Sequence, residues 1–211
     1  MPAGAGGGHG TWWRWCVRDG DGMAQSVVIE RWTADRERVG EDLERLGEVL
    51  HACVHAGASV SFVLPFSREE ARAFWQEQVL PAVEAGKRRV VLARVAGEIV
   101  GTVQLDLATP PNQPHRAEVK KLLVHPEARR RGIARALMQA VEEEARAEGR
   151  TLLTLDTVTG GAAERLYRSL GYVAAGGIPG YALNFDRSGI EERRTAERSG
   201  SPCRTRRRRR R

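Results

Sequence analysis

A basic turn between a strand pattern and a helix pattern has the composition of an anion-binding site. The apolar run Val119–Val124 predicts a strand, and apolar or small residues spaced four apart after Gly132 predict a helix that ends at Gly149. The first N–H groups of a helix lack internal partners and lie at its positive end, so they can bind a phosphate. Three arginines add charge to the turn, although a solvated basic loop would have the same composition. The residues that would hold the phosphate are Arg129, Arg130, Arg131, Gly132, Ile133 and Ala134.

The order of residues in this turn resembles a motif of a known protein family. Arg129-x-x-Gly132-x-Ala134 is similar to the Gln/Arg-x-x-Gly-x-Gly/Ala motif with which the GNAT N-acetyltransferase superfamily binds acetyl-CoA. The resemblance extends over residues 27–185, and short segments such as Gly177–Tyr181 are similar to tabtoxin-resistance-type acetyltransferases. It implies that acetyl-CoA is the co-substrate and that the basic turn binds its diphosphate.

The same resemblance implies a fold. It indicates a single α/β (α+β) domain with a mixed central sheet that is flanked by helices and splayed near its centre, where the cofactor binds. Strand and helix patterns alternate through the body of the chain, which agrees with one layered domain. Backbone groups of Leu122, Leu123 and Val124 would hold the pantetheine arm as an added strand would.

A second match indicates a candidate acid. Leu166-Tyr167-x-x-x-Gly171 resembles the family's late helix and the strand after it, in which the tyrosine points at the sulfur of CoA. A phenol is protonated at neutral pH, with a reference pKa near ~10. The resemblance therefore implies that Tyr167 protonates the departing thiolate. Without the resemblance, a helix tyrosine packed into the core is the simpler interpretation.

The residue that deprotonates the amine is left open among three candidates. Glu118 ranks first, because carboxylates on the central strand often serve this superfamily directly or through water. Asp156 ends a predicted strand beside the splay, and it could instead bind the ammonium group of the substrate. His115 has a suitable unperturbed pKa, but it follows a proline-rich loop. Each of the three could also be an ordinary surface or salt-bridged group.

In this superfamily the chain segment between the first two helices tends to form the acceptor pocket. Trp75 could therefore face the substrate together with Phe62 and Phe66, although core packing is the simpler explanation for each ring. Tyr181, which follows a Pro-Gly pair, could cover the acceptor site, and His115 could contact the acceptor. These aromatic residues favour a small acceptor over a protein.

The expected reaction is direct transfer of the acetyl group to a primary amine of a small molecule within a ternary complex. The alternatives are acetylation of a protein N-terminus or lysine, and a non-catalytic CoA-binding domain.

Cys53 and Cys203 lie outside the predicted site, so no acyl-enzyme is expected. The scattered cysteines form no CxxC pair, which predicts a cytoplasmic location and no metal site. No apolar run approaches the ~18–20 residues that span a bilayer, so no membrane segment is expected.

Composition divides the chain into a body and two tails. Residues 1–24 are glycine-rich and are predicted to be disordered, residues 25–186 are predicted to form the acetyltransferase domain, and residues 187–211 are predicted to be a disordered arginine-rich tail. The last segment holds eleven Arg and three Glu, a charge of +8 against +7 for the whole chain. The body is therefore close to neutral, and nucleic acid or an anionic membrane is expected to bind only through the tail, if at all.

The family's last strand is expected to be missing. The superfamily usually ends with a strand inserted between its fifth and sixth, and no apolar run remains after Phe185 to form one. The arginine-rich end could therefore be aberrant rather than functional. A second copy could complete the open edge in a homodimer.

Local signals predict several element ends. Ser67 and Glu70 have the spacing of a capping box, and Thr33 or Asp35 could cap the preceding helix. Gly176–Tyr181 is predicted to be a turn, because it is rich in glycine and contains a proline.

Overall fold

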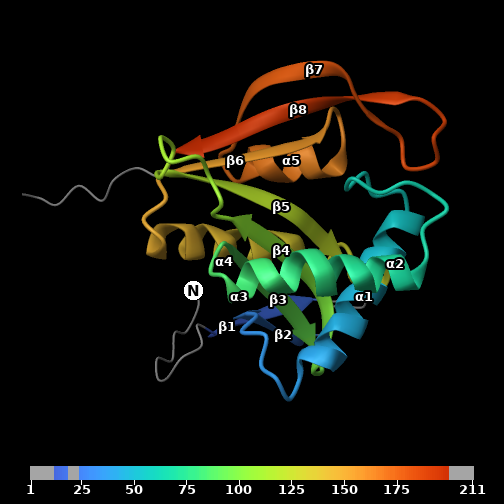
Figure 1. Ribbon diagram of the computed structural model, residues 1–211, viewed down its shortest axis with the longest axis vertical. Helices are drawn as coiled ribbons and strands as arrows, with labels where there is room; N and C mark the ends of the chain where they lie inside the picture. Colours follow the sequence, from blue (N-terminus) through green and yellow to red (C-terminus); the bar gives the residue numbers. More distant parts are fainter. Residues whose placement is uncertain (1–11, 19–23, 200–211) are drawn as a thin grey trace, which may run out of the picture.

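The computed structural model describes residues 12–18 and 24–199, which form one eight-stranded sheet with helices on both faces (Figure 1). The strands are β1 (Trp12–Arg18), β2 (Ala24–Arg31), β3 (Arg88–Val95), β4 (Glu98–Asp106), β5 (Arg116–Val124), β6 (Leu152–Val158), β7 (Val173–Leu183) and β8 (Ile190–Ser199). The helices are α1 (Val39–His55), α2 (Arg68–Ala73), η1 (Phe74–Val79), α3 (Leu80–Glu84), η2 (Pro126–Ala128), α4 (Ile133–Ala147) and α5 (Ala162–Ser169). The sheet order is β1-β2-β3-β4-β5-β6-β8-β7, and β5 and β6 are its parallel neighbours. The predicted mixed sheet flanked by helices is confirmed.

Two hydrophobic cores lie on opposite faces of the sheet, because successive residues of a strand point to opposite sides. In β3, Val91 and Ala93 pack in the core that contains α4, whereas Val90 and Leu92 pack in the core that contains α1. Tyr167 of α5 belongs to the α4 core. Helices α4 and α5 therefore cover one face, and the helices before β3 cover the other.

Helix α4 follows the pattern predicted for it. Ile133, Leu137, Val141 and Ala145 are each at most 1% exposed. Gly149 follows the helix with a φ of +68°, a backbone conformation that favours glycine. The spacing of four in the sequence therefore gave the buried face of this helix correctly.

Strands β5 and β6 begin side by side and then part. Their parallel pairing covers only Arg116–Glu118 with Leu152–Thr154. Beyond this point β5 bulges against β4, where Lys121 and Leu122 together stand opposite one residue. Lys121 has a φ of +50° in this bulge. The rest of β5 therefore has an edge toward β6 that no strand pairs among the described residues.

The predicted absence of the last strand is wrong. Strand β8 lies between β6 and β7 and pairs with both, within the segment predicted to be a disordered tail. Its sequence contains no apolar run, but its charged side chains have partners: Arg193 pairs with Asp156, and Arg194 pairs with Glu164. Ala196 adds one buried apolar contact. A strand whose backbone is bonded on both sides does not need an apolar sequence when its charges have partners.

The other differences are at element ends. The backbone of β1 pairs with β2, so the predicted disordered segment 1–24 contains a strand. Strand β7 runs through Gly176–Tyr181, where a turn was predicted, with an irregular register against β8. The capping box of Ser67 and Glu70 is confirmed, but α1 begins after Arg38 without a side-chain cap.

The run of six arginines at the end of the chain lies outside the described residues. No helix in the described part is both long and apolar enough to cross a membrane.

Candidate active site

The turn before α4 has the geometry of an anion cradle. Arg130 and Gly132 both have left-handed backbone, with φ of +66° and +80°. Gly132 is the N-cap of α4, and no side chain caps this helix end. The first N–H groups of α4, beginning at Ile133 and Ala134, are therefore available to an oxyanion. This arrangement fits the diphosphate of acetyl-CoA.

The arginines of the turn contribute in different ways. The Arg129 Nε donates to the backbone oxygen of Val124 at 3.2 Å, and the Arg131 Nη2 donates to the backbone oxygen of Glu127 at 3.1 Å. The first bond fastens the turn to the last residue of β5, and the second fastens it to η2. The side chain of Arg130 is exposed. Side-chain bonds of Arg129 and Arg131 thus hold the turn in place before the start of α4.

The open edge of β5 lies next to this turn. Leu122, Leu123 and Val124 form the part of β5 beyond its pairing with β6, as the predicted pantetheine site requires. On the other side, β4 approaches very closely, because a Cβ at Gly101 would lie 2.9 Å from the Leu123 oxygen. An extended ligand could therefore pair with the free edge, while β4 supports the strand from behind.

Cys53 lies closer to this edge than predicted. Its Sγ donates to the Val124 oxygen at 3.3 Å, so the prediction that it lies outside the site is wrong. The thiol is 1% exposed, and burial raises its pKa. A buried, protonated thiol is a poor nucleophile, which agrees with a reaction without an acyl-enzyme.

Tyr167 is buried on α5 with its ring 5.8 Å from that of Tyr172. Burial and then the negative charge of Asp156 raise the pKa of the Tyr167 phenol well above its usual value. The phenol therefore keeps its proton at neutral pH and can act as a donor. A hydrogen bond of 2.7 Å from Arg135 to Ser169 ties the end of α5 to the start of α4.

Asp156 is on β6 and faces away from the α4 core, since Leu153 and Leu155 alternate with it and pack in that core. The carboxylate lies 2.5 Å from the guanidinium of Arg193 on β8. Arg193 is 8% exposed and was not among the predicted site residues. Its segment looked like a tail, so only its position in a paired strand reveals it.

Lys121 is the second unpredicted residue of this region. Its Nζ donates to the Val60 oxygen and to the Ser61 Oγ, and it lies 5.1 Å from the ring centre of Phe62 and 5.7 Å from that of Phe74. Burial is the main cause that lowers its pKa to about 8, and nearby cations add to this. The signal in the sequence was a pair of lysines inside an otherwise apolar strand.

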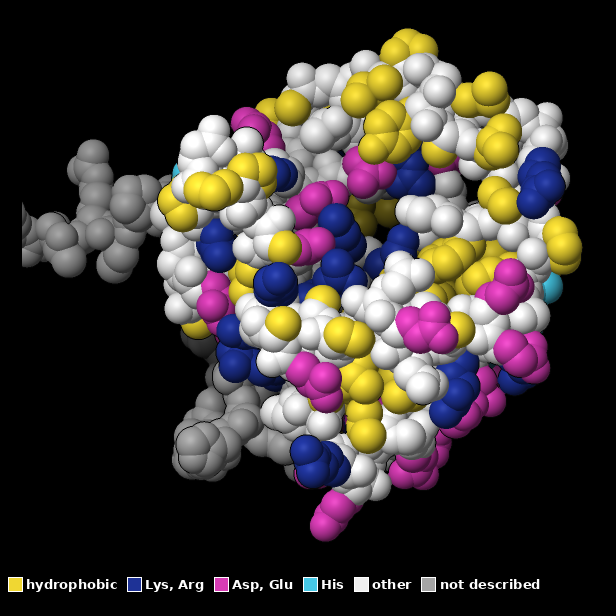
Figure 2. All heavy atoms as spheres, in the orientation of Figure 1, with side chains coloured by type: hydrophobic (Ala, Val, Ile, Leu, Met, Phe, Trp, Pro, Cys, Tyr) yellow, Lys and Arg dark blue, Asp and Glu magenta, His cyan; other side chains and the backbone are white. Residues whose placement is uncertain are grey.

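Glu118 lies on the same face of the sheet as Asp156. It pairs in register with Thr154, two residues before Asp156 on β6, and Lys120 lies 3.2 Å from its carboxylate. The two carboxylates are similarly accessible, with 34% and 35% of their side-chain surfaces exposed. Figure 2 shows basic and acidic side chains gathered around a hollow near the centre of this view.

The other predicted substrate residues fare differently. Trp75 is fully buried in the α1 core, so the prediction that it faces the acceptor is wrong. Phe62 and Phe74 are the rings beside Lys121. His115 is exposed, and its carbonyl accepts from the amides of Thr151 and Leu152 at the start of β6, where β5 and β6 are still paired. Tyr181 is 52% exposed on β7, and its role over the acceptor stays a prediction.

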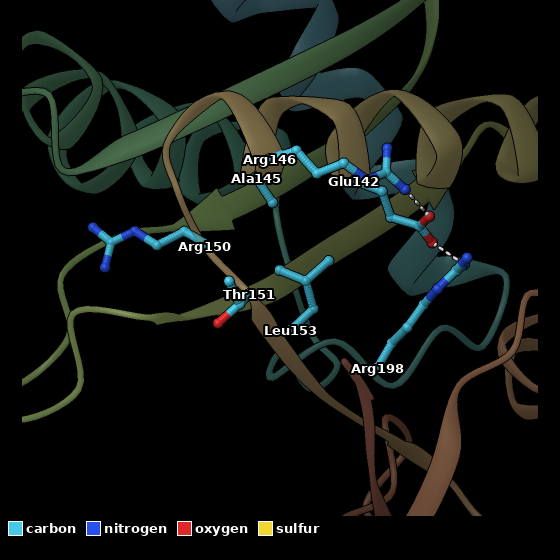
Figure 3. Close-up of a pocket in the computed structure, with 7 residues that line it drawn as sticks. All are labelled: Glu142, Ala145, Arg146, Arg150, Thr151, Leu153 and Arg198. Atoms are coloured by element: carbon cyan, nitrogen blue, oxygen red, sulfur yellow. Dashed lines mark hydrogen bonds and ion pairs between the residues drawn. The ribbon is translucent and has the colours of Figure 1, made fainter. Parts of the chain in front are cut away.

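A small pocket lies elsewhere, between α4 and the strands of its face (Figure 3). It is lined by Glu142, Ala145, Arg146, Arg150, Thr151, Leu153 and Arg198. Within it, the Arg198 Nη1 lies 2.6 Å from the Glu142 Oε1. This ion pair anchors β8 to α4, so the pocket belongs to the packing of the last strand. The described residues contain no group of three or more His, Cys, Asp or Glu that could hold a metal.

Comparison with known proteins gives the same assignment from sequence and from structure. Residues 54–172 match the Acetyltransferase (GNAT) family. An uncharacterized N-acetyltransferase of Azospirillum brasilense is 36% identical over 132 residues, which cover 62% of this chain and 74% of the relative. The IAA acetyltransferase of the same organism is 36% identical over 89 residues, which cover 42% of this chain and 56% of the relative.

Solved structures share the fold. A GCN5-related N-acetyltransferase from Kribbella flavida has a TM-score of 0.64 and 24% identity, with 81% of this chain and 97% of the other covered. The yncA protein of Salmonella typhimurium, solved with its cofactor acetyl-CoA, has a TM-score of 0.65 and 18% identity, with 82% and 94% covered. The family match spans the predicted phosphate turn, the open edge of β5 and Tyr167. This chain therefore belongs to the GNAT family of acetyltransferases, which use acetyl-CoA.

Proposed function

We propose that this protein transfers the acetyl group of acetyl-CoA directly to a primary amine of a small molecule in a ternary complex. The observation that supports this most is the parting of β5 from β6, which leaves a free edge of β5 that leads to the uncapped start of α4, with Asp156 on the parted end of β6 and Tyr167 on the helix that follows it. The negative charge of Asp156 suits an ammonium group, and the phenol proton of Tyr167 suits a leaving thiolate.

The roles follow from the bonds that change. The amine must lose a proton, its nitrogen forms a bond to the acetyl carbon, and the bond from that carbon to sulfur breaks. Asp156 or Glu118 accepts the amine proton, directly or through water, and Tyr167 gives its proton to the sulfur. We favour Asp156 as the acceptor-side carboxylate, because it lies where β6 has parted from β5 and its negative charge also raises the pKa of the Tyr167 phenol.

A small acceptor is favoured by the loop that follows α1. Lys121 bonds to Val60 and Ser61 of this loop, and Arg193 bonds to Ser59. The loop is thus fastened to the same face of the sheet as the two carboxylates, which narrows the access that an extended protein segment would need. The names of related proteins include both an IAA acetyltransferase and a ribosomal-protein-alanine N-acetyltransferase, so protein acetylation is the second candidate.

The charged lining predicts a polar acceptor. Glu118, Lys120 and Asp156 are each partly exposed on this face, and their charges alternate in sign. We also propose that the protein acts in the cytoplasm, which is consistent with the free, buried thiol of Cys53.

The direct experiment is a thiol-release assay with acetyl-CoA and a panel of acceptors. The panel would contain amino acids, polyamines, aryl amines and short peptides with free N-termini or lysines. Release of CoA with small amines and little with peptides is expected. Preferential acetylation of peptides would replace the small-molecule proposal by the protein-acetylation alternative, and binding of acetyl-CoA without turnover on any amine would support a non-catalytic domain.

A further inference from the structure

We propose that Arg193 is a positioning residue for the acceptor half of this reaction, because it aims Asp156 and fixes the loop around Ser59 beside it. The inference rests on the proposed function. Neither role was visible in the sequence, where Arg193 belongs to a segment without apolar pattern.

All three nitrogens of the guanidinium are engaged. The Nη1 bonds to the Asp156 carboxylate at 2.5 Å, the Nε to the Glu191 carboxylate at 3.2 Å, and the Nη2 to the backbone oxygen and the Oγ of Ser59 at 2.7 and 2.9 Å. The side chain is only 9% exposed. Arg193 therefore joins three parts of the chain that are far apart in sequence: the loop after α1, β6 and β8.

The same loop is held from the other side of the splay. Lys121 on β5 donates to the Val60 oxygen and to the Ser61 Oγ, while Arg193 on β8 donates to Ser59. The Ser59 Oγ also donates to Glu191, which makes the attachment to β8 reciprocal. Two cations from opposite sides of the parted strands thus fix three consecutive loop residues.

The arrangement requires an arginine. A guanidinium presents its donors in a planar fork, so it can reach Asp156, Glu191 and Ser59 at once in fixed directions. A lysine would keep the charge but has one nitrogen for these three partners. The contact to Asp156 alone would satisfy a simple ion pair, so the additional bonds to Ser59 are the feature that indicates positioning.

The test compares Arg193→Lys and Arg193→Gln with Arg194→Gln as a matched control. Arg194 is the next residue of β8 and also pairs with a carboxylate, Glu164 at 3.0 Å, but its partner lies on α5. Both Arg193 variants are expected to lower kcat/KM for the amine by about 10–100-fold, the cost of a displaced reacting group. Calorimetric affinity for acetyl-CoA should stay within about twofold of wild type, because Arg193 lies outside the stretch proposed to bind the cofactor. Arg194→Gln should retain wild-type values for both.

A second measurement does not depend on the acceptor. Hydrogen exchange at the amides of Ala58 and Leu64, which flank this loop and donate to the Cys53 and Phe185 oxygens, should be faster in Arg193→Gln than in wild type or Arg194→Gln. Unchanged exchange would overturn the positioning of the loop, even if no acceptor had been found. Failure of the wild type to acetylate any amine would instead overturn the proposed function and leave this exchange result standing.

A mutant cycle separates positioning from general stability. If Arg193 acts through Asp156, the double variant Arg193→Gln with Asp156→Asn should be no slower than Asp156→Asn alone. If the loss of kcat/KM in the double variant equals the product of the losses in the two single variants, Arg193 does not act through Asp156. If Arg193→Gln fails to fold, Arg193→Lys carries the test, and wild-type kinetics together with wild-type exchange in that variant would overturn the proposal.

Discussion

The cofactor half and the acceptor half of the candidate site are built in different ways. The cofactor half is one continuous stretch, from Leu122 to Ala134, and it presents mainly backbone: a free strand edge, then an uncapped helix start. The acceptor half is assembled from Ser59, Asp156 and Arg193, which lie on separate elements and are held by charged side chains. The first half is therefore readable as a motif, while the second exists only when the chain is folded.

The largest expected effect is that of removing the Tyr167 hydroxyl, which tests whether catalysis can be lost while the cofactor half still binds acetyl-CoA. Tyr167→Phe removes the proton donor and keeps the ring, so kcat should fall by about 10²–10⁴-fold, the range for general acid catalysis, with little change in acetyl-CoA affinity. Tyr172→Phe is the matched control, since its ring packs against Tyr167 in the same core. Steady-state kinetics of both variants measure the contrast. Equal losses in the two would show that Tyr167 acts through packing.

The next effect distinguishes the two carboxylates. Asp156→Asn is expected to lower kcat/KM for the amine by about 100-fold, since it removes the carboxylate proposed to accept the amine proton. Glu118→Gln should cost clearly less, because Glu118 lies where β5 is still paired with β6, before the two strands part. Kinetics with a saturating donor and varied amine measure both. A larger loss in Glu118→Gln would exchange the roles of the two residues.

The smallest effect concerns Lys121, which lies on β5 of the cofactor half and bonds to the loop of the acceptor half. Burial lowers the pKa of Lys121 to about 8 from a reference value of 10.5. Between these pH values the unfolded chain binds a proton that the folded chain does not, so the stability contributed by this residue should rise with pH. Below pH 8 the full penalty of the buried charge is present.

Urea unfolding of wild type and Lys121→Met at several pH values isolates this contribution. The stability of wild type relative to the variant should increase from pH 8 to pH 10, at no more than about 1.4 kcal/mol per pH unit, the limit for one proton. A difference that stays constant or falls over this range would show that Lys121 has an ordinary pKa.

The sequence predicted the elements that obey local rules. The spacing of Ile133 and Leu137, the glycine after α4 and the capping box at Ser67 are all signals within a few residues, and the structure contains each of them. The candidate phosphate turn and Tyr167 could be proposed from the sequence because they lie in short motifs. Resemblance to a family added the open strand edge between them.

The missed features depend on contacts between distant segments. Strand β8 looked like a tail, because Arg193 and Arg198 pair with Asp156 on β6 and with Glu142 on α4, which are far away in the sequence. The bulge that turns Lys121 toward the loop depends on the register between β4 and β5. Trp75 was assigned to the pocket by its position along the chain, whereas the π-helical turn η1 places it in the core. No local pattern carries this information.

The cofactor half is tested most directly by a pair of glycines at the two ends of α4. Gly132 and Gly149 both have positive φ, so replacing either by Val strains the backbone by about 1–2 kcal/mol. Only Gly132 lies where the diphosphate would meet the helix start. Calorimetric titration with acetyl-CoA should show an affinity at least about tenfold lower for Gly132→Val, or about 1.4 kcal/mol, and a wild-type affinity for Gly149→Val. Equal affinities of the two folded variants would contradict the binding of acetyl-CoA at the turn before α4.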